Sequence, residues 1–491
     1  MYEKLGFFIN GEWRTGSGKG EDVLNPANES VLAFLPHASQ KDLEDALESA
    51  QRGFKIWKNA PVQKRAAILQ KTADLIEERS EQIARIITLE QGKPLRESQG
   101  ELQRTVETFR WNAAYAIENI EKRSILRQTG LRQSVRVEPV GVSLGLTPWN
   151  FPAFLVARKL APALAAGCSM ILKASEETPG TAVALIRALS DAGLPEGVVN
   201  LVFGVPAEIS KKFFASDIVR KVSFTGSVPV GKQLANLASS GLKRCTFELG
   251  GHSPAIVCED SDIDAALSTL TAFKFRNSGQ VCIAPSRFFV HRSLYSSFVE
   301  GFVEAAKSQC LGDGFEEETT MGPMSNVRRI ESMENLVQDA VTRGAKVLTG
   351  GKRRGQVGFF WEPTILTDVP EDSEIMLVEP FGPLVPIIAF DSLEEVILKA
   401  NSLSYGLAAY VFTQSDKTTE KLVESLETGG IAVNSAAPVP SDLPYGGFKD
   451  SGYGYEGGIE GVEAYQHKKL VSLALSLIHI SEPTRPLYIS Y

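Results

Sequence analysis

Four short apolar segments, each followed by a longer stretch of helical pattern, constrain the fold of this chain most strongly. They cover residues 142–146, 169–173, 199–204 and 221–226. Neighbouring parallel strands need a long crossover, usually a helix, so this alternation predicts a parallel β-sheet covered by helices. A second series of the same kind begins near residue 253 and runs to about residue 435. The sequence therefore predicts an α/β fold with two parallel-sheet domains.

Long amphipathic helices are expected before the first series. Apolar residues recur at spacings of three and four over residues 42–57 and again over residues 62–93, where Gly92 punctuates the second run. From about residue 132 the pattern changes to alternation, which predicts extended strands. Folds of this kind bind ligands beyond the carboxyl ends of their strands. We therefore expect the functional site in the cleft between the two sheets.

Composition narrows the class of protein. The chain has 491 residues, of which 43% are hydrophobic, and a net charge of −8. Neither sign of charge gathers into a long run, so we expect no nucleic-acid partner. The first residues carry charge and lack an apolar core, and no window approaches the ~18 uninterrupted apolar residues of a membrane span. We expect a cytoplasmic protein without membrane contact.

The cysteines indicate chemistry rather than cross-linking. Five cysteines lie far apart, with no CxxC pair and only five histidines in the chain. An odd, scattered set argues against a disulfide framework, and it also argues against a zinc site. We expect no metal, and any special cysteine is expected to be a reactive thiol.

Cys282 is the cysteine with the most informative surroundings. It follows the small, flexible stretch Ser278-Gly279-Gln280, which lets the backbone approach a substrate. Taken alone, such a residue is more often a buried free thiol. Glu248 stands 34 residues earlier, before a double glycine, and alone it would more often be a solvated surface charge.

Together with PWNFP at 148–152, these two segments resemble the aldehyde dehydrogenase superfamily, and the resemblance runs from about Phe8 to about Ser472. Supporting motifs occur in the order of that family: Ile9-Asn10-Gly11, Asn25-Pro26, Glu90-Gln91-Gly92-Lys93, Lys173-Ala174-Ser175-Glu176, Phe224-Thr225-Gly226-Ser227, Glu379-Pro380-Phe381-Gly382-Pro383 and Pro444-Tyr445-Gly446-Gly447. The chain looks most like NAD-dependent succinate-semialdehyde dehydrogenases.

This resemblance implies two Rossmann-like domains and a small β oligomerisation element. The expected NAD-binding domain covers residues 1–127 and 141–250, and the catalytic domain covers 251–436. The oligomerisation element is expected over 128–140 and 437–472, so we expect a homo-oligomer, either a dimer or a tetramer. Residues 473–491 match nothing expected of the family, and they resemble translated vector sequence more than a genuine terminus.

The resemblance also implies how the reaction runs. The Cys282 thiolate attacks the aldehyde carbon, and the Asn150 amide and the Cys282 N–H hold the resulting oxyanion. Glu248 then activates the water that hydrolyses the thioester, so the product is a free acid and not a coenzyme A ester. Without the family, Asn150 would be read as a turn residue beside Pro148 and Pro152.

The expected cofactor is NAD. Lys173 and Glu176 correspond to positions that meet the adenosine ribose, where a carboxylate disfavours the 2′-phosphate of NADP. Gly226, Ser227 and Gly231 are expected to hold the pyrophosphate at a helix start. The remaining implied contacts are Thr147, Pro148, Trp149, Gly204, Leu249, Glu379 and Phe381. Taken alone, Lys173 and Glu176 would indicate an exposed loop pair, and the Gly226–Gly231 spacing would indicate a tight turn. The EPFGP segment alone would indicate a rigid turn.

Two arginines point to the substrate. Arg158 and Arg276 match positions that bind the distal carboxylate in succinate-semialdehyde dehydrogenases, and Ser441 could replace, with a different reach, the serine that those enzymes have shortly before the PFGG-like turn. Each arginine alone is more often a surface salt-bridge residue. We expect succinate semialdehyde as substrate, with another semialdehyde or a lactaldehyde- or glycolaldehyde-type substrate as alternatives.

Two other classes of protein are less consistent with the sequence. A non-catalytic protein on the same fold would not need Cys282, Glu248 and Asn150 together. A cysteine hydrolase would need a histidine base, and His252 has no expected orienting partner, so a structural role is expected for it.

Overall fold

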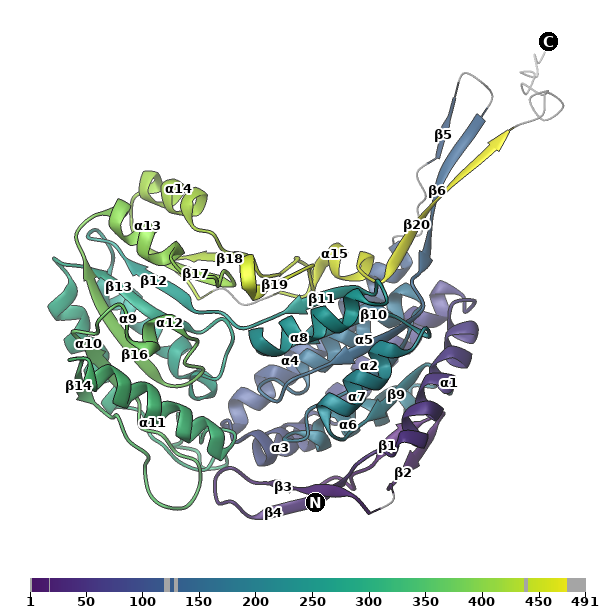
Figure 1. Cartoon of the computed structure of the whole chain (residues 1–491), viewed down its shortest axis with the longest axis horizontal. Coiled ribbons are helices and arrows are strands. Elements are labelled where there is room, and N and C mark those ends of the chain that lie inside the picture. Colours follow the sequence, from purple (N-terminus) through teal and green to yellow (C-terminus); the bar gives the residue numbers. More distant parts are fainter. Residues whose placement is uncertain (1, 17, 119–123, 128–130, 437–439, 475–491) are drawn as a thin grey trace, which may run out of the picture.

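The computed structural model describes residues 2–16, 18–118, 124–127, 131–436 and 440–474. These residues form two lobes and a projecting arm (Figure 1). Residues 128–130 and 437–439 of the expected oligomerisation element, and residues 475–491 of the expected tail, lie outside the described residues.

An eight-stranded sheet forms the core of the first lobe. Its five central strands are parallel, while the strands at both edges pair antiparallel. The order across the sheet is β19 (Gly452–Tyr453), β11 (Arg244–Glu248), β10 (Val219–Thr225), β7 (Val142–Leu146), β8 (Ser169–Lys173), β9 (Val199–Val202), β1 (Phe7–Ile9) and β2 (Glu12–Arg14). All four strands expected in the first series are therefore confirmed.

Helices cover both faces of this sheet (Figure 1). They are α1 (Gln40–Trp57), α2 (Val62–Glu78), α3 (Ser80–Gln91), α4 (Leu95–Glu118), α5 (Phe154–Ala166), α6 (Pro179–Asp191), α7 (Pro206–Ala215) and α8 (Val228–Ser239). The single helical run expected over 62–93 is in fact two helices, because Arg79 leaves helical geometry at φ −96° and ψ 11°. The buried Trp57 indole N–H donates to Leu164 O at 2.9 Å and so connects α1 to α5.

A seven-stranded sheet forms the core of the second lobe, which confirms the second expected series. All neighbouring strands of this sheet pair in parallel except the edge strand β14 (Lys346–Thr349), which is antiparallel to its neighbour. The order is β14 (Lys346–Thr349), β15 (Thr364–Thr367), β16 (Leu384–Phe390), β13 (Pro285–His291), β12 (Ser253–Val257), β17 (Ala408–Phe412) and β18 (Gly430–Val433). Its helices are α9 (Ile263–Phe275), α10 (Tyr295–Lys307), α11 (Val327–Thr342), α12 (Glu374–Leu377), α13 (Leu393–Asn401) and α14 (Asp416–Ser425).

The arm in Figure 1 is a three-stranded antiparallel sheet. It consists of β20 (Gln466–Ala474), β6 (Leu131–Pro139) and β5 (Ser124–Leu126). The arm thus begins before residue 128, and β20 extends two residues into the stretch interpreted as an atypical tail. By contrast, Gly452–Tyr453, inside the range expected for oligomerisation, joins the sheet of the first lobe.

Smaller elements complete the described chain. These are the hairpin β3 (Gly20–Leu24) and β4 (Val31–Pro36), the helix α15 (Gly458–Glu463), and the 3-10 turns Arg276–Gly279 and Lys449–Ser451. Within the described ranges, no helix is both long enough and apolar enough to cross a bilayer.

Candidate active site

The three residues expected to perform the chemistry come from both lobes. Glu248 is the last residue of β11, and Asn150 lies in the loop that follows β7. Both strands pair with β10 in parallel, so their carboxyl ends lie at the same edge of the sheet. Cys282 lies in the loop before β13 and packs against the core of the second lobe. The candidate site therefore lies between the lobes, as expected.

Reciprocal hydrogen bonds join the loop of Cys282 to the loop of Asn150. The Asn150 amide donates to Gln280 O at 3.1 Å, and the Asn277 amide donates to Asn150 O at 3.0 Å. The turn between them is left-handed at Asn277 and Ser278, with φ of 50° and 55°. Such backbone costs about 1–3 kcal/mol per residue and persists only where its surroundings enforce it.

Asn150 is deeply buried and retains unused donor capacity. Its carbonyl also accepts from Lys93 Nζ at 2.7 Å, and Lys93 is in turn paired with the buried Glu101 at 2.7 Å. An amide NH₂ has two donors, and only the bond to Gln280 O uses one of them among the described residues. The second donor is available to an oxyanion that forms beside Cys282.

The Cys282 thiol lies in an environment that opposes ionisation. Burial raises its pKa, and the negative charges of Glu248 and Glu379 raise it further, while backbone N–H groups of Cys282 and Ile283 lower it. Cys282 is partly exposed to the cleft. At neutral pH the side chain is therefore a thiol, and its attack on a substrate requires a group that accepts the proton.

Glu248 has the properties of a base that works near neutrality. Burial raises its pKa to about 8, and the charge of Glu456 raises it too, against the attraction of Arg158 and Lys159. Its Oε1 atom is buried and has no hydrogen-bond partner among the described residues. A carboxylate of raised pKa with an unused oxygen can take a proton from a thiol or a water molecule.

Glu456 and Lys159 belong to this site but were missed from the sequence. Lys159 Nζ donates to Glu456 and to Thr225 Oγ1, the latter at 2.6 Å, and Ser223 also donates to Glu456 at 3.0 Å. Burial alone would raise the pKa of Glu456, but the positive charges of Lys159 and Arg158 hold it below its usual value. A lysine within the apolar run of α5 was the only available signal for this pair.

The expected adenosine contacts converge beside the ends of β8 and β9. Lys173 Nζ donates to Glu176 Oε2 at 2.5 Å, and Gly204 N donates to Glu176 Oε1 at 3.3 Å. Both side chains are mostly buried, so an exposed loop pair is excluded. Burial raises the pKa of Glu176. The pair is held in place as a ribose-binding arrangement requires.

The expected pyrophosphate contact lies at the N-terminus of α8. Ser227 caps that helix by its extended backbone, and its side chain makes no capping bond. Gly231 packs so tightly that an added Cβ would lie 2.5 Å from the Leu249 side chain. The nearby Thr147 Oγ1 is buried without a partner among the described residues. Free N–H groups, an unused hydroxyl and an unpaired threonine fit a bound dinucleotide.

Glu379 and Phe381 reach the same cleft from the second lobe. Glu379 Oε1 accepts from Gly251 N at 3.2 Å, and burial raises the pKa of Glu379 to about 8. Phe381 has a left-handed φ of 46° and lies edge-on to Trp149, with ring centroids 5.6 Å apart. The EPFGP turn is thus held against the PWNFP loop, where a nicotinamide ribose could be bound.

Of the two expected substrate arginines, Arg158 is buried and Arg276 is partly buried. Arg158 Nε lies 3.6 Å from Glu456 Oε2, and Arg158 Nη1 donates to Pro440 O at 3.3 Å. Arg276 forms no salt bridge with a carboxylate among the described residues; burial lowers its pKa, and the charge of Glu97 opposes that shift most strongly. Ser441 lines a pocket with Arg158, and its hydroxyl lies 3.0 Å from Thr108 Oγ1.

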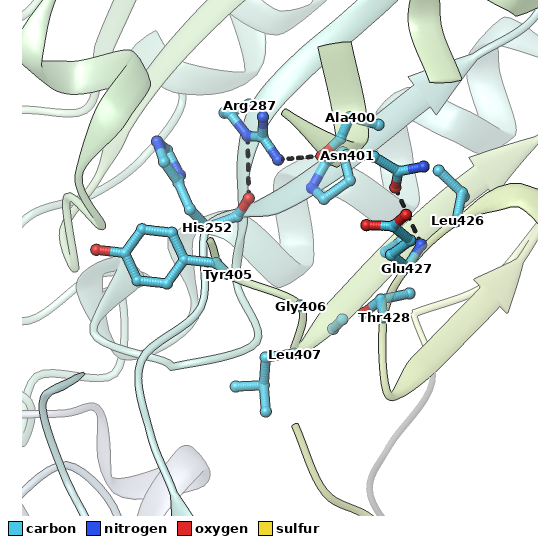
Figure 2. A pocket seen from close by; sticks show the side chains of 13 residues that line it. His252, Arg287, Ala400, Asn401, Tyr405, Gly406, Leu407, Leu426, Glu427 and Thr428 are labelled. Atoms are coloured by element: carbon cyan, nitrogen blue, oxygen red, sulfur yellow. Dashed lines mark hydrogen bonds between the residues drawn. The ribbon is translucent and has the colours of Figure 1, made fainter. Parts of the chain in front are cut away.

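His252 occupies a different environment, shown in Figure 2. Its ring nitrogens lie 2.8 Å from Ser286 Oγ and 3.0 Å from Ile375 O, and burial holds its pKa well below the usual value. Arg287 donates to His252 O at 3.0 Å. Neither Cys282 nor Glu248 lines this pocket. A neutral histidine bound on both sides is a structural element, which leaves a cysteine hydrolase without its base.

Two helix-covered sheets, with a cysteine, a buried carboxylate and a dinucleotide cradle between them, define a dinucleotide-dependent oxidoreductase. The comparison with known families specifies it further. Residues 13–471 match the model of the aldehyde dehydrogenase family, and the chain belongs to that family. It is therefore an enzyme that oxidises aldehydes with NAD or NADP.

Similar proteins cover nearly the whole chain. The 4-(hydroxymethyl)benzenesulfonate dehydrogenase TsaD1 of Comamonas testosteroni is 43% identical over 96% of this chain and 98% of its own length. The NADP(+) succinate-semialdehyde dehydrogenase GabD of Escherichia coli is 37% identical over 95% and 97%. The NAD+ complex of an aldehyde dehydrogenase from Bacillus cereus is 37% identical, with a TM-score of 0.94 over 96% of this chain and 97% of that chain.

The charge on Glu456 predicts a pH effect on catalysis. Because the pKa of Glu248 is raised to about 8, its basic form and hence kcat should rise as the pH passes through about 8. Glu456→Gln removes a negative neighbour and leaves Arg158 and Lys159, so the pKa of Glu248 should fall and the rising limb should move to lower pH. Profiles of kcat against pH measure this shift.

The matched control is Glu460→Gln, the same change at an exposed position of α15, which should leave the limb in place. A limb that stays or moves upward in a folded Glu456→Gln enzyme would contradict the role assigned to Glu456.

Proposed function

We propose that this enzyme oxidises an aldehyde with a terminal anionic group to the free acid, using NAD, with succinate semialdehyde as the first substrate to test. The observation that carries this proposal is the pair of guanidinium groups of the buried Arg158 and the partly buried Arg276, which interact electrostatically with Glu248 and Cys282 respectively. Guanidinium groups bind carboxylates through paired donors. The names of two relatives contain an acidic group, a sulfonate in one and a succinate carboxylate in the other.

The first half of the mechanism follows from the two raised pKa values. The Cys282 thiol loses its proton to Glu248 while the sulfur forms a bond to the aldehyde carbon. The negative charge that develops on the carbonyl oxygen is stabilised by the second Asn150 N–H and by the backbone N–H of Cys282. The thioester forms when the former aldehyde carbon loses its hydrogen as a hydride, and NAD, when bound, would supply the hydride acceptor.

The second half removes the acyl group from Cys282. Glu248 first releases to solvent the proton that it took from Cys282. Water then attacks the thioester carbon while Glu248 takes a proton from that water, and the carbon–sulfur bond breaks. The sulfur regains a proton and the product leaves as a carboxylic acid. Glu248 with its unused oxygen supports water as the acceptor, in preference to coenzyme A.

Cys282→Ser tests the nucleophile. We expect NADH formation, followed by absorbance near 340 nm, to fall by at least about a thousandfold, because a serine hydroxyl is a much weaker nucleophile here. The dissociation constant for NAD, measured by calorimetry, should change by less than about threefold. The exposed Cys310→Ser variant is the control and should retain activity. Substantial turnover by Cys282→Ser would refute the covalent mechanism.

Glu176 supports NAD over NADP. Its carboxylate is held by Lys173 and Gly204 where an adenosine ribose would lie, and it would repel a 2′-phosphate. We expect Glu176→Ser to raise the ratio of kcat/KM for NADP to that for NAD by at least about tenfold, because a like-charge contact is removed.

The neighbouring Glu177→Ser variant is the control for the cofactor experiment. Glu177 pairs with Arg328 instead of Lys173, so its loss should leave the NADP to NAD ratio unchanged. Equal ratios in wild-type enzyme and Glu176→Ser would show that this carboxylate does not select the cofactor.

Arg276 tests the substrate class. Loss of a charged hydrogen bond costs about 1.5–3 kcal/mol, so Arg276→Ala should lower kcat/KM for succinate semialdehyde by at least about tenfold. The value for the uncharged butanal should change by less than about threefold. Arg292→Ala, an exposed arginine of the same lobe paired with Asp391, is the control. An effect within about threefold on succinate semialdehyde would rule out Arg276 as an anion-binding residue.

We also propose that the arm mediates a homo-oligomer. Large apolar side chains are exposed on it, including Leu126 at 63%, Leu470 at 67% and Leu473 at 53%. Exposed apolar strands at the edge of a small sheet are typical of surfaces that pair with another chain.

A further inference from the structure

A third arginine, not expected from the sequence, lies beside the substrate pair. Arg104 is on α4 and lines a pocket together with Arg276, Phe151 and Phe154. The Arg104 guanidinium lies 5.8 Å from the centre of the Phe154 ring, and the Arg158 guanidinium lies 5.4 Å from the same ring. Arg104 and Arg158 therefore share the Phe154 ring, while Arg276 lines the same pocket as Arg104 and lies over the Phe151 ring, 5.4 Å from its centre.

These charges repel one another and are incompletely neutralised. Burial lowers the pKa of Arg104 and the positive charges of Arg276 and Arg158 lower it further, against the opposing effect of Glu107 and Glu101. Arg104 forms no salt bridge with a carboxylate of the described chain, and Arg276 forms none either. Two buried donor atoms, Arg158 Nη2 and Arg276 Nε, have no partner among the described residues. Partly buried, like-charged donors in this state favour binding of an anion.

Arg158 shares Glu456 with Lys159, whereas the two carboxylates near Arg104 and Arg276 are bound to other groups. Glu101 uses both oxygens, one on Lys93 Nζ and the other on the N–H groups of Ala153 and Phe154. Glu97 accepts from Asn277 N at 2.8 Å, and burial raises its pKa, which favours the neutral form. The site therefore keeps an excess of positive charge toward the substrate.

We propose that Arg104 joins Arg158 and Arg276 in binding a sulfonate, so that the preferred substrate class is an aldehyde bearing a terminal sulfonate. This inference rests on the proposed function, because it assigns the anionic group that the function requires. A carboxylate has two oxygens in one plane, which two guanidinium groups satisfy. A tetrahedral sulfonate has three equivalent oxygens, none of which carries a proton. All three therefore accept hydrogen bonds, and arginine side chains only donate them.

Arg104 is a specificity-determining residue in this scheme, since the chemistry occurs at Cys282. Its contribution should appear with substrates that differ only in the terminal group. Butanal, succinate semialdehyde, 3-sulfopropanal and 3-phosphonopropanal share the aldehyde and a two-carbon spacer, and they end in a methyl, carboxylate, sulfonate and phosphonate group.

The experiment compares kcat/KM for these four aldehydes in wild-type enzyme and in Arg104→Gln. For wild-type enzyme we expect 3-sulfopropanal to exceed succinate semialdehyde by at least about tenfold, the value of one charged hydrogen bond. Arg104→Gln should remove at least about tenfold from 3-sulfopropanal, with less than about threefold change for succinate semialdehyde and butanal. Arg104→Lys keeps the charge but not the planar fork, so it should restore only part of the loss.

Arg110→Gln is the control variant, because Arg110 lies further along α4, where it pairs with Asp74 and Glu77 at the surface. It should leave all four values unchanged. If Arg104→Gln fails to fold, the comparison of Arg104→Lys with wild-type enzyme decides: an unchanged preference for 3-sulfopropanal overturns the inference.

The outcomes separate this inference from the proposed function. If the kcat/KM of wild-type enzyme for butanal equals its kcat/KM for the anionic aldehydes, the proposed function itself is contradicted. Enzyme that prefers anionic aldehydes but favours succinate semialdehyde or 3-phosphonopropanal over 3-sulfopropanal overturns only the sulfonate inference. Equal losses for carboxylate and sulfonate in Arg104→Gln likewise overturn it, since Arg104 would then not distinguish the two groups.

Discussion

The hydrogen bonds between Asn150 and the turn at 277–280 are the interaction on which the rest of the site depends. They join a loop of the first lobe to the loop that carries Cys282 in the second, at 3.1 Å and 3.0 Å. The nucleophile is therefore fixed relative to Glu248 and to the dinucleotide cradle, which belong to the other lobe. A displacement of about 1 Å in such a site can cost a hundredfold in rate, so this contact has consequences beyond its own energy.

Burial is the second constraint, and it acts on every titratable group in the cleft. It raises the pKa values of Cys282, Glu248 and Glu379, and it lowers the pKa of Arg276. A dry site strengthens the hydrogen bonds that stabilise a developing charge, but it also keeps the nucleophile protonated. Proton transfer from Cys282 to the ionised form of Glu248 resolves this conflict, and that form becomes more abundant as the pH rises toward the Glu248 pKa of about 8.

Much of the fold follows from local pattern, while several site residues do not. Short apolar strands such as 142–146 were predictable because their period and their flanking helices are local properties of the chain. The separation of α2 from α3 at Arg79 was not, because an amphipathic pattern continues across it. The Lys159–Glu456 pair joins residues 297 positions apart, and only the folded chain brings them together. Arg104 likewise occupies an ordinary helical position, and its meaning comes from Phe154 and Arg276 nearby.

The distribution of unsatisfied polar atoms connects these observations. Buried side-chain atoms without partners occur in several parts of the described chain, and six of them belong to residues of the expected site, namely Thr147, Asn150, Arg158, Glu248, Arg276 and Asn277. Each such atom costs about 1–3 kcal/mol in stability relative to a satisfied one. A folded chain tolerates that cost where a ligand completes the bonds, and a functional cleft is where local rules of stability are expected to fail. The atoms of Thr147, Arg158 and Arg276 can donate hydrogen bonds, while those of Asn150, Asn277 and Glu248 are oxygens that accept them. The fold thus leaves both donors and acceptors in the site available to a bound ligand.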